Sequence, residues 1–384
     1  RMMHIEGCKV VALCDLVEEN INDAMSIIAE YGHTTPATFT GTDGWKQLCK
    51  QPDIDLVYIC TDWASHADIA VYAMLQGKHV ATEVPAATTV ADCWRLVDTA
   101  EQTQRHCIML ENCCYGEAEM AVMHMVSQGL FGEVVHCEGG YRHDLRDEIV
   151  FGKENRHYRL RNYLTRNCEN YPTHELGPIA QILDINRGNR FLSLVSVASK
   201  SAGLNQFAAD HPNANPELAT AKFAQGDVVT TVIKCARGET ITLHLDTSLP
   251  RPYSRGFTIQ GTKGMYQEDT RSFFIDADMG GKEHWDWSPE WNNQVKYFEK
   301  YRHPVWVDYL ANGIRGGHGG MDGLVYNEFI ECVRLGKPCP IDVYDGAAWM
   351  AVTALSEESI AKGGMPVAFP DFTSGAWCAY SVEE

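Results

Sequence analysis

The first 112 residues alternate short apolar runs with helix-like segments, and this alternation restricts the possible folds more than any other feature. Each run is continuously apolar, which is typical of a strand buried on both faces of a parallel sheet. The runs lie at residues 8–14, 54–60, 79–82 and 107–110. The segments between them have the length and composition of helices. This order predicts a doubly wound parallel α/β sheet of the Rossmann type, in which ligands bind at the carboxyl ends of the strands.

From about residue 115 the pattern becomes that of an α+β domain. We expect a long amphipathic helix at 117–128. Strands with alternating side chains then recur at 133–136, 227–234, 239–245 and 256–260. They predict a large open sheet, antiparallel or mixed, and the aromatic and polar segment 272–322 is expected to form rim loops. We therefore divide the chain into a dinucleotide-binding domain, 1–114, and a substrate and oligomerisation domain, 115–384.

Charge and composition exclude several classes of partner. The chain has 51 acidic and 32 basic residues, a formal net charge of −19, so a nucleic-acid partner is not expected. A neutral small molecule is unaffected by that charge. No apolar run approaches the roughly 20 residues that span a bilayer. The 14 cysteines contain no C-x-x-C pair, which favours reduced thiols over a disulfide framework or a metal site.

Polar residues follow the expected strands of the first domain. Asp15 closes the first strand, where an acid can bind the adenosine ribose of a dinucleotide. An ordinary acid in a turn is the alternative, because the Gly-rich fingerprint should lie about 20 residues earlier, before Arg1. The other strand ends carry the further cofactor candidates, which are Trp63, Ala64, Ser65, His66, Glu83, Val84 and Asn112. His66 alone has a second interpretation, as the cap of the helix that follows it.

The second domain carries the densest group of proton-transfer side chains. Tyrosine, histidine and arginine can bind sugar hydroxyls and move protons without a metal. The candidates are Tyr141, Arg159, Tyr171, Pro172, Thr173, His174 and Tyr253. The Gly-rich segment 316–322 follows a helix-like stretch rather than a strand, so we expect a loop there and not a phosphate cradle.

Several of these segments resemble glycoside hydrolase family 109, within the glucose–fructose oxidoreductase and inositol dehydrogenase superfamily. The resemblance extends from residue 9 to residue 373. Its most specific segments are 140–146, 171–174, 184–190, 225–231, 246–253 and 316–322. It implies a tightly held NAD⁺ that is recycled in each turnover. The sugar is oxidised at C3, the aglycone leaves by elimination, water adds and the ketone is reduced.

The resemblance also implies roles for individual residues. The cofactor candidates above, together with Tyr171, would line NAD. Tyr141, Arg159, Tyr253 and the segment 171–174 would line the sugar. His174 or Tyr171 would take the C3 hydroxyl proton, and Tyr141 or Tyr253 would act at the C2 or leaving-group proton. The implied substrate is a glycan with terminal N-acetylgalactosamine, and no metal is implied.

Two residues depart from the related patterns. Val84 stands where superfamily dehydrogenases carry lysine, which favours the hydrolase. Glu175 stands where the hydrolases carry glycine, and it could tune His174 or contact the sugar, so the anomer is left open. The alternatives are an NAD-dependent sugar or cyclitol dehydrogenase and a non-catalytic sugar or dinucleotide sensor. The resemblance implies a homo-oligomer and export in the folded state, whereas the cysteines favour a reducing cell interior.

Overall fold

The computed structural model describes residues 2–154, 157–278 and 288–379. Contacts between backbone positions group the chain into two compact units. The first comprises 1–112 with 313–347, and the second comprises 113–312 with 348–384. The sequence placed the division at 114/115 and assigned 313–347 to the second domain. Residues 313–347 belong to the first unit because Asp322 and Tyr326 form hydrogen bonds with residues at the strand ends of that unit.

The first unit contains two parallel sheets. In one, β1 (Ala12–Asp15) pairs with β2 (Ala37–Thr40), and in the other β4 (His79–Thr82) lies between β3 (Leu56–Ile59) and β5 (Cys107–Met109). The helical elements are η1 (Met2–His4), α1 (Glu18–Glu30), α2 (Gly44–Cys49), α3 (His66–Leu75), α4 (Val90–Thr103), η6 (His318–Gly320) and α12 (Met321–Leu335). This arrangement confirms the predicted parallel α/β class. Strand β2 lies in a segment that the sequence did not assign to a strand.

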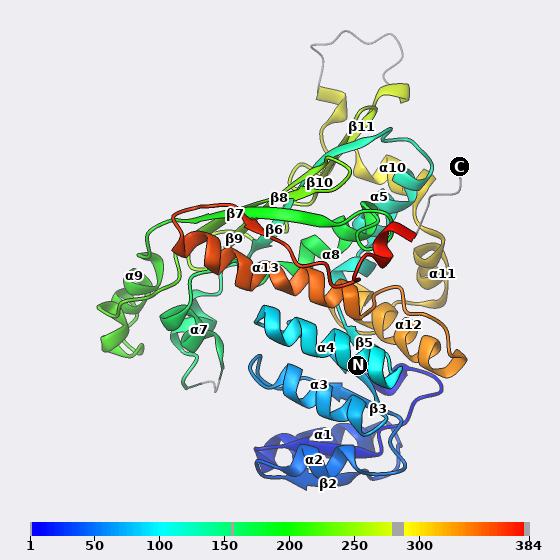
Figure 1. Cartoon of the computed structure of the whole chain (residues 1–384), viewed down its shortest axis with the longest axis vertical. Helices are drawn as coiled ribbons and strands as arrows, with labels where there is room; N and C mark the ends of the chain where they lie inside the picture. The colour runs from blue at the N-terminus through cyan, green and yellow to red at the C-terminus, as the bar shows by residue number, and fades with distance from the viewer. Residues whose placement is uncertain (1, 155–156, 279–287, 380–384) are drawn as a thin grey trace. The chain divides into compact units, whose positions relative to one another are not determined.

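Burial on both faces explains why the strands of the second sheet are continuously apolar. Ile59, Val80 and Ile108 are at most 2% exposed. Helix α3 packs against β3 and β4 of this sheet, and α4 lies beside α3 (Figure 1). Helix α4 begins where the Thr89 hydroxyl accepts a hydrogen bond from the Asp92 amide, a standard N-cap.

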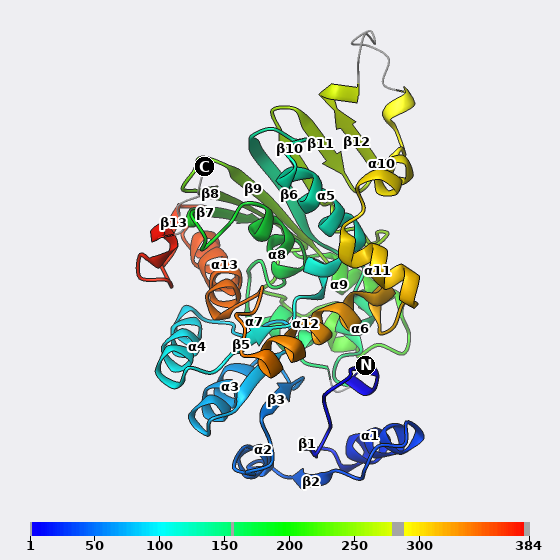
Figure 2. The ribbon, with the colours of Figure 1, turned by 90° about the vertical axis from the view of Figure 1, so that its right-hand side faces the viewer.

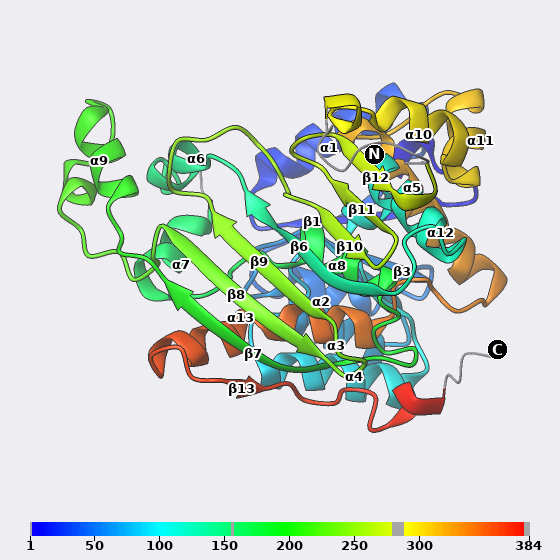
Figure 3. The same ribbon diagram turned by 90° about the horizontal axis from the view of Figure 1, so that it is seen from above.

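The second unit is built on a mixed eight-stranded sheet in the order β12-β11-β10-β6-β9-β8-β7-β13. Strands β6 and β9 are parallel and all other neighbours are antiparallel, as Figure 3 shows for the central strands. The strands are β6 (Val134–Arg142), β7 (Phe191–Ala198), β8 (Val228–Cys235), β9 (Thr240–Asp246), β10 (Thr258–Gly261), β11 (Gly264–Gln267), β12 (Ser272–Ile275) and β13 (Val367–Ala368). The predicted large mixed sheet is confirmed.

Helices of the second unit cover one face of this sheet. Helix α8 packs on β6, and the Ser196 amide of β7 donates to the Ser359 hydroxyl of α13, at 2.9 Å. Helix α13 begins at Val343, in the first unit, and ends at Ala361. The other helices are α5 (Glu117–Ser127), α6 (Arg146–Val150), α7 (Arg159–Thr165), α8 (Thr173–Ile182) and α9 (Gly203–Asp210).

The segment 272–322 was expected to form loops apart from the helix-like stretch that precedes 316–322; that stretch is confirmed as α11 (Pro304–Asn312), and the segment contains further regular elements. These include β12, η5 (Ser288–Glu290) and α10 (Gln294–Tyr301), and α10 lies beside α5 and β12 (Figure 2). Aromatic packing explains the difference, because the rings of Phe273 and Tyr297 stack with centroids 4.8 Å apart. Part of that prediction, residues 279–287, lies outside the described residues.

Among the described residues, no helix combines the length and the apolar character that crossing a membrane requires.

Candidate functional site

Three aromatic residues of the second unit meet at the carboxyl end of β6 and the start of α8. Tyr141 is near the end of β6, Tyr171 precedes α8, and His174 lies in the first turn of α8. The ring centroids are 4.6 Å apart for the two tyrosines, 4.8 Å for Tyr171 and His174, and 5.3 Å for Tyr141 and His174. Pro172 and Thr173, also predicted, are buried at the helix start. The structure therefore brings most of the predicted sugar-lining residues together.

A buried arginine packs against the rings of this aromatic group. The Arg159 guanidinium is 5.0 Å from the Tyr171 ring centroid and 6.0 Å from that of Tyr141, and the residue is 6% exposed. Its Nε pairs with Glu148 Oε1 at 2.5 Å. Burial opposes the charge, but the surrounding tyrosines, led by Tyr171, raise the pKa of Arg159 above its usual range. The site therefore contains a permanent cation next to two phenols.

His143 extends the group toward Tyr253, and sequence reasoning did not single it out. The Tyr141 hydroxyl lies 3.0 Å from His143 Nδ1, and the His143 and Tyr253 rings meet edge to face at 5.0 Å. Burial, followed by the charge of Arg159, lowers the pKa of His143, so the imidazole is neutral near pH 7 and can accept the phenolic proton. Burial raises the pKa of Tyr141 to about 12. Tyr141 is therefore protonated at rest.

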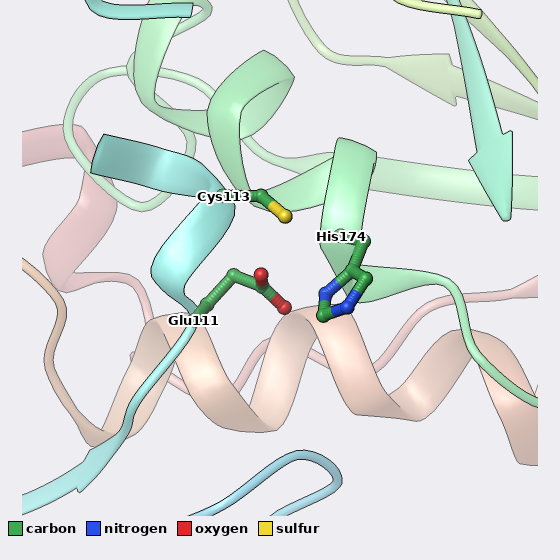
Figure 4. A group of neighbouring side chains, drawn as sticks. All are labelled: Glu111, Cys113 and His174. Carbon is green, nitrogen blue, oxygen red and sulfur yellow. The ribbon is translucent and has the colours of Figure 1, made fainter. Parts of the chain in front are cut away.

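Cys113 is a second residue that sequence reasoning missed at this site. Its sulfur and a ring nitrogen of His174 lie within 4.8 Å, and the two side chains point toward one another (Figure 4). The Arg255 guanidinium donates to the same sulfur at 3.4 Å. A thiol and an imidazole can bind metals, but a guanidinium against the sulfur disfavours a metal cation there.

A buried carboxyl group lies two residues before Tyr171. Glu169 is 0% exposed, and its amide donates to the Ser356 hydroxyl of α13 at 2.8 Å. Burial raises the pKa of this carboxyl to about 8, against a small opposing effect of the Tyr171 amide. Glu169 is therefore protonated at neutral pH, which avoids the large cost of an isolated buried charge.

In the first unit, the predicted cofactor residues hold polar bonds at the strand ends. Asp15 accepts hydrogen bonds from the Val17 amide at 2.8 Å and from Asn20 Nδ2 at 3.0 Å. The ring nitrogens of His66 lie 2.7 Å from the Pro85 carbonyl oxygen and 3.0 Å from that of Thr61. These bonds fix the orientation of the imidazole, and no cap on α3 comes from its side chain.

The next two strand ends depend on residues from 313–347. Glu83, after β4, accepts hydrogen bonds from the Tyr58 hydroxyl and, at 2.6 Å, from the Tyr326 hydroxyl. The Asn112 amide donates to Asp322 Oδ1 at 2.7 Å. His318 Nδ1 lies 3.0 Å from the same carboxylate. The Gly-rich segment 316–322 thus contributes to this edge through Asp322, at the start of α12.

The remaining predicted cofactor residues differ in exposure. Trp63 and Val84 are 5% and 7% exposed, Ser65 is partly buried and Ala64 is exposed. The last residues of β3, β4 and β5 are paired side by side, so polar groups that follow them share one edge. A dinucleotide needs acceptors for ribose hydroxyls and amide partners for nicotinamide. Glu83 and Asn112 carry groups of these kinds at that edge, and Asp15 carries one at the end of β1 in the other sheet, so the chemistry of the residues present fits the predicted cofactor.

Comparison with known proteins agrees with these observations. Residues 115–379 match the family model described as glycosyl hydrolase 109, C-terminal domain. Residues 2–111 match that of an oxidoreductase family with an NAD-binding Rossmann fold, which supports the predicted cofactor.

Two relatives and one solved structure illustrate the similarity. A glycosyl hydrolase family 109 protein from Phocaeicola vulgatus is 45% identical over 98% of this chain and 91% of its own. An alpha-N-acetylgalactosaminidase from Bacteroides fragilis is 43% identical over 98% of this chain and 89% of its own. A levoglucosan dehydrogenase in complex with NADH has a TM-score of 0.67 at 20% identity, over 94% of this chain and 90% of that one. At that identity the dehydrogenase supports the fold alone.

Proposed function

Because the chain belongs to glycosyl hydrolase family 109, we propose that it removes terminal N-acetylgalactosamine from glycans by NAD-dependent oxidation, elimination, addition and reduction. One observation carries the proposal: the family match spans 115–379, which includes the whole group formed by Tyr141, Arg159, Tyr171, His174 and Tyr253. The glycan that is cleaved and the anomer of its terminal sugar are part of this proposal, and the test below uses both anomers.

The cofactor fits the first unit through Asp15, Trp63 to His66, Glu83, Val84 and Asn112, with Tyr171 of the second unit as a further predicted contact. When bound, NAD⁺ reversibly accepts a hydride from carbon 3 of the sugar. The residues of this chain then donate and accept the protons. A ketone at C3 makes the C2 hydrogen acidic, so a weak base close to C2 is sufficient to start elimination.

The aromatic group has suitable acids and bases for these steps. We assign the C3 hydroxyl proton to His174 or Tyr171, and the C2 or leaving-group proton to Tyr141 or Tyr253. Arg159 stabilises negative charge that develops on a phenol or on a sugar oxygen nearby. Tyr141, protonated at rest, is suited to donate to the leaving oxygen, and His143 Nδ1, 3.0 Å from its hydroxyl, can orient that hydroxyl.

Hydrolysis of p-nitrophenyl α- and β-N-acetylgalactosaminide, with and without added NAD⁺, tests the proposal. We expect release of nitrophenol from at least one anomer without net formation of NADH. In D₂O, deuterium should appear at C2 of the released sugar. Net reduction of added NAD⁺ would instead identify a dehydrogenase, and binding without turnover would identify a sensor. Release without deuterium at C2 would contradict the redox route.

We also propose that the chain forms a homo-oligomer. The sheet face opposite α13 exposes apolar side chains, with Val197 54% and Val232 42% exposed. Val232 pairs across the two strands with Val195, and apolar side chains that share one sheet face can mark an interface. Light scattering on purified protein should give a mass above 42.9 kDa.

A further inference from the structure

Three segments distant in sequence place one arginine between two buried carboxylates. Arg255 Nη2 pairs with Glu119 Oε1 of α5, and Arg255 Nε lies 3.1 Å from Glu175 Oε2 of α8. The three side chains are 11%, 2% and 0% exposed for Arg255, Glu119 and Glu175. Sequence spacing gives no sign of this cluster, which we call the Arg255 clamp.

Two glycines make room for the clamp. A Cβ atom added at Gly139 of β6 would lie 2.3 Å from Glu175 Cγ, and one added at Gly116 would lie 1.9 Å from Glu119 Oε2. Real Cβ atoms do not approach other atoms so closely, so an alanine at either position would displace a carboxylate from the guanidinium. Neither glycine has a positive φ. The space next to the carboxylates, rather than the backbone conformation, therefore requires glycine.

The clamp joins the two sides of the aromatic site. Glu175 directly follows His174 in the first turn of α8, and Arg255 follows Tyr253 by two residues. The third contact of the guanidinium, at 3.4 Å, is the sulfur of Cys113, which lies beside His174. Because the Glu175 side chain is fully buried against Arg255, it is directed into the protein and not toward a sugar.

We propose that Arg255, held between Glu119 and Glu175, is a positioning residue that fixes His174 relative to Tyr253. This inference rests on the proposed glycosidase function and refines it. Glu175 then acts through the geometry of α8 rather than by touching substrate. The guanidinium suits this task because it is planar and has N–H groups on several sides: it donates hydrogen bonds to Glu119 and Cys113 and forms an ion pair with Glu175, whereas a lysine would hold only part of the arrangement.

The two carboxyl groups of the Arg255 clamp provide a pair of matched variants. Glu175→Gln and Glu119→Gln each replace one carboxyl group by an amide and leave the other carboxyl group beside Arg255. Only Glu175 is adjacent to His174. A purely structural clamp predicts that the two variants lose thermal stability and leave kcat unchanged. A positioning clamp predicts a kcat defect that is larger for Glu175→Gln than for Glu119→Gln.

The experiment measures kcat and KM for the p-nitrophenyl sugar, thermal unfolding, and crystal structures of the two variants. For Glu175→Gln we expect kcat to fall about tenfold to a hundredfold with little change in KM, because an error of about 1 Å in a catalytic group can cost about 10²-fold. Arg255→Lys should show the same kcat defect. Added ethylguanidinium should restore part of the activity of Arg255→Ala, which loss of fold alone would not allow.

Equal kcat values in Glu175→Gln, Glu119→Gln and the unmodified protein would overturn the proposal. So would an unmoved His174 ring in the Glu175→Gln crystal structure. That second measurement needs no turnover, so it tests the clamp even if the unmodified protein releases no nitrophenol. In that case the proposed function fails, while the positioning of His174 by Arg255 is judged from the coordinates.

Discussion

The two units hold their functional residues in different ways. In the first unit, each polar side chain at a strand end is tied by hydrogen bonds, as Glu83 is by the hydroxyls of Tyr58 and Tyr326. In the second unit, aromatic rings pack against one another around the buried cation Arg159. Directed bonds suit recognition of a fixed cofactor, whereas packed rings with exchangeable protons suit chemistry. Substitutions in the two units should therefore fail in different ways.

The largest effect is expected at the aromatic group of the second unit. His174→Ala should lower kcat by about 10²- to 10⁴-fold, the usual contribution of a general acid or base. NAD affinity, measured by calorimetry, should change little, because the residues proposed to bind NAD, apart from Tyr171, belong to the first unit. His211→Ala, at the exposed end of α9, is the matched control. Loss of NAD binding in His174→Ala would break the distinction between the units.

The next largest effect is expected when the planar guanidinium of the buried Arg159 is replaced by a different cation. Arg159→Lys should lower kcat about tenfold to a hundredfold, since an ammonium group cannot both stack on Tyr171 and hold Glu148 in the same geometry. Steady-state kinetics on the p-nitrophenyl substrate measure this effect. An unchanged kcat would show that charge alone is sufficient beneath the rings.

A substitution in the first unit should change binding rather than chemistry. Asp15→Asn should weaken NAD binding by about tenfold, as expected for loss of one hydrogen bond to a charged acceptor. At saturating NAD⁺, kcat should be retained, and NADP should be discriminated against less strongly. Fluorescence titration with both cofactors measures this. If kcat fell at saturating cofactor while affinity stayed the same, the assignment of Asp15 to the ribose would be wrong.

The buried carboxyl group of Glu169 should make the stability of the second unit depend on pH. The pKa of Glu169 is about 8 in the folded protein, against a usual value of 4.5. Between these values the folded state holds a proton that the unfolded state has released, so stability should fall as pH rises from about 4.5 to about 8. Glu169→Gln is uncharged throughout and should flatten that slope in urea unfolding. Glu30→Gln, at an exposed position of α1, should leave the slope unchanged.

The sequence predicted those parts of the molecule that depend on local pattern. Continuous apolar runs located β1, β3, β4 and β5, and alternating residues located β6, β8, β9 and β10. Short or largely exposed strands such as β2 lack that signal. In the same way, the charged and aromatic residues of α10 resemble a loop until Phe273 and Tyr297 stack.

The residues of the candidate site also fall into those that a local pattern predicts and those that only the fold brings together. Residue type and motif singled out Tyr141, Arg159, Tyr171 and His174, and the structure places them together. Cys113 and Arg255 were missed because they are 142 residues apart and only the fold joins them. The dependence of Asn112 on Asp322, 210 residues later, was invisible for the same reason.

The close approach of Gly139 and Glu175 has a consequence for the evolution of this chain. The two positions cannot change independently, since a side chain at 139 would occupy the volume that the glutamate fills. In an alignment of relatives, we expect residues larger than glycine at 139 only where position 175 is itself small. Glycine at position 139 would therefore have to precede glutamate at position 175 in the evolution of the chain.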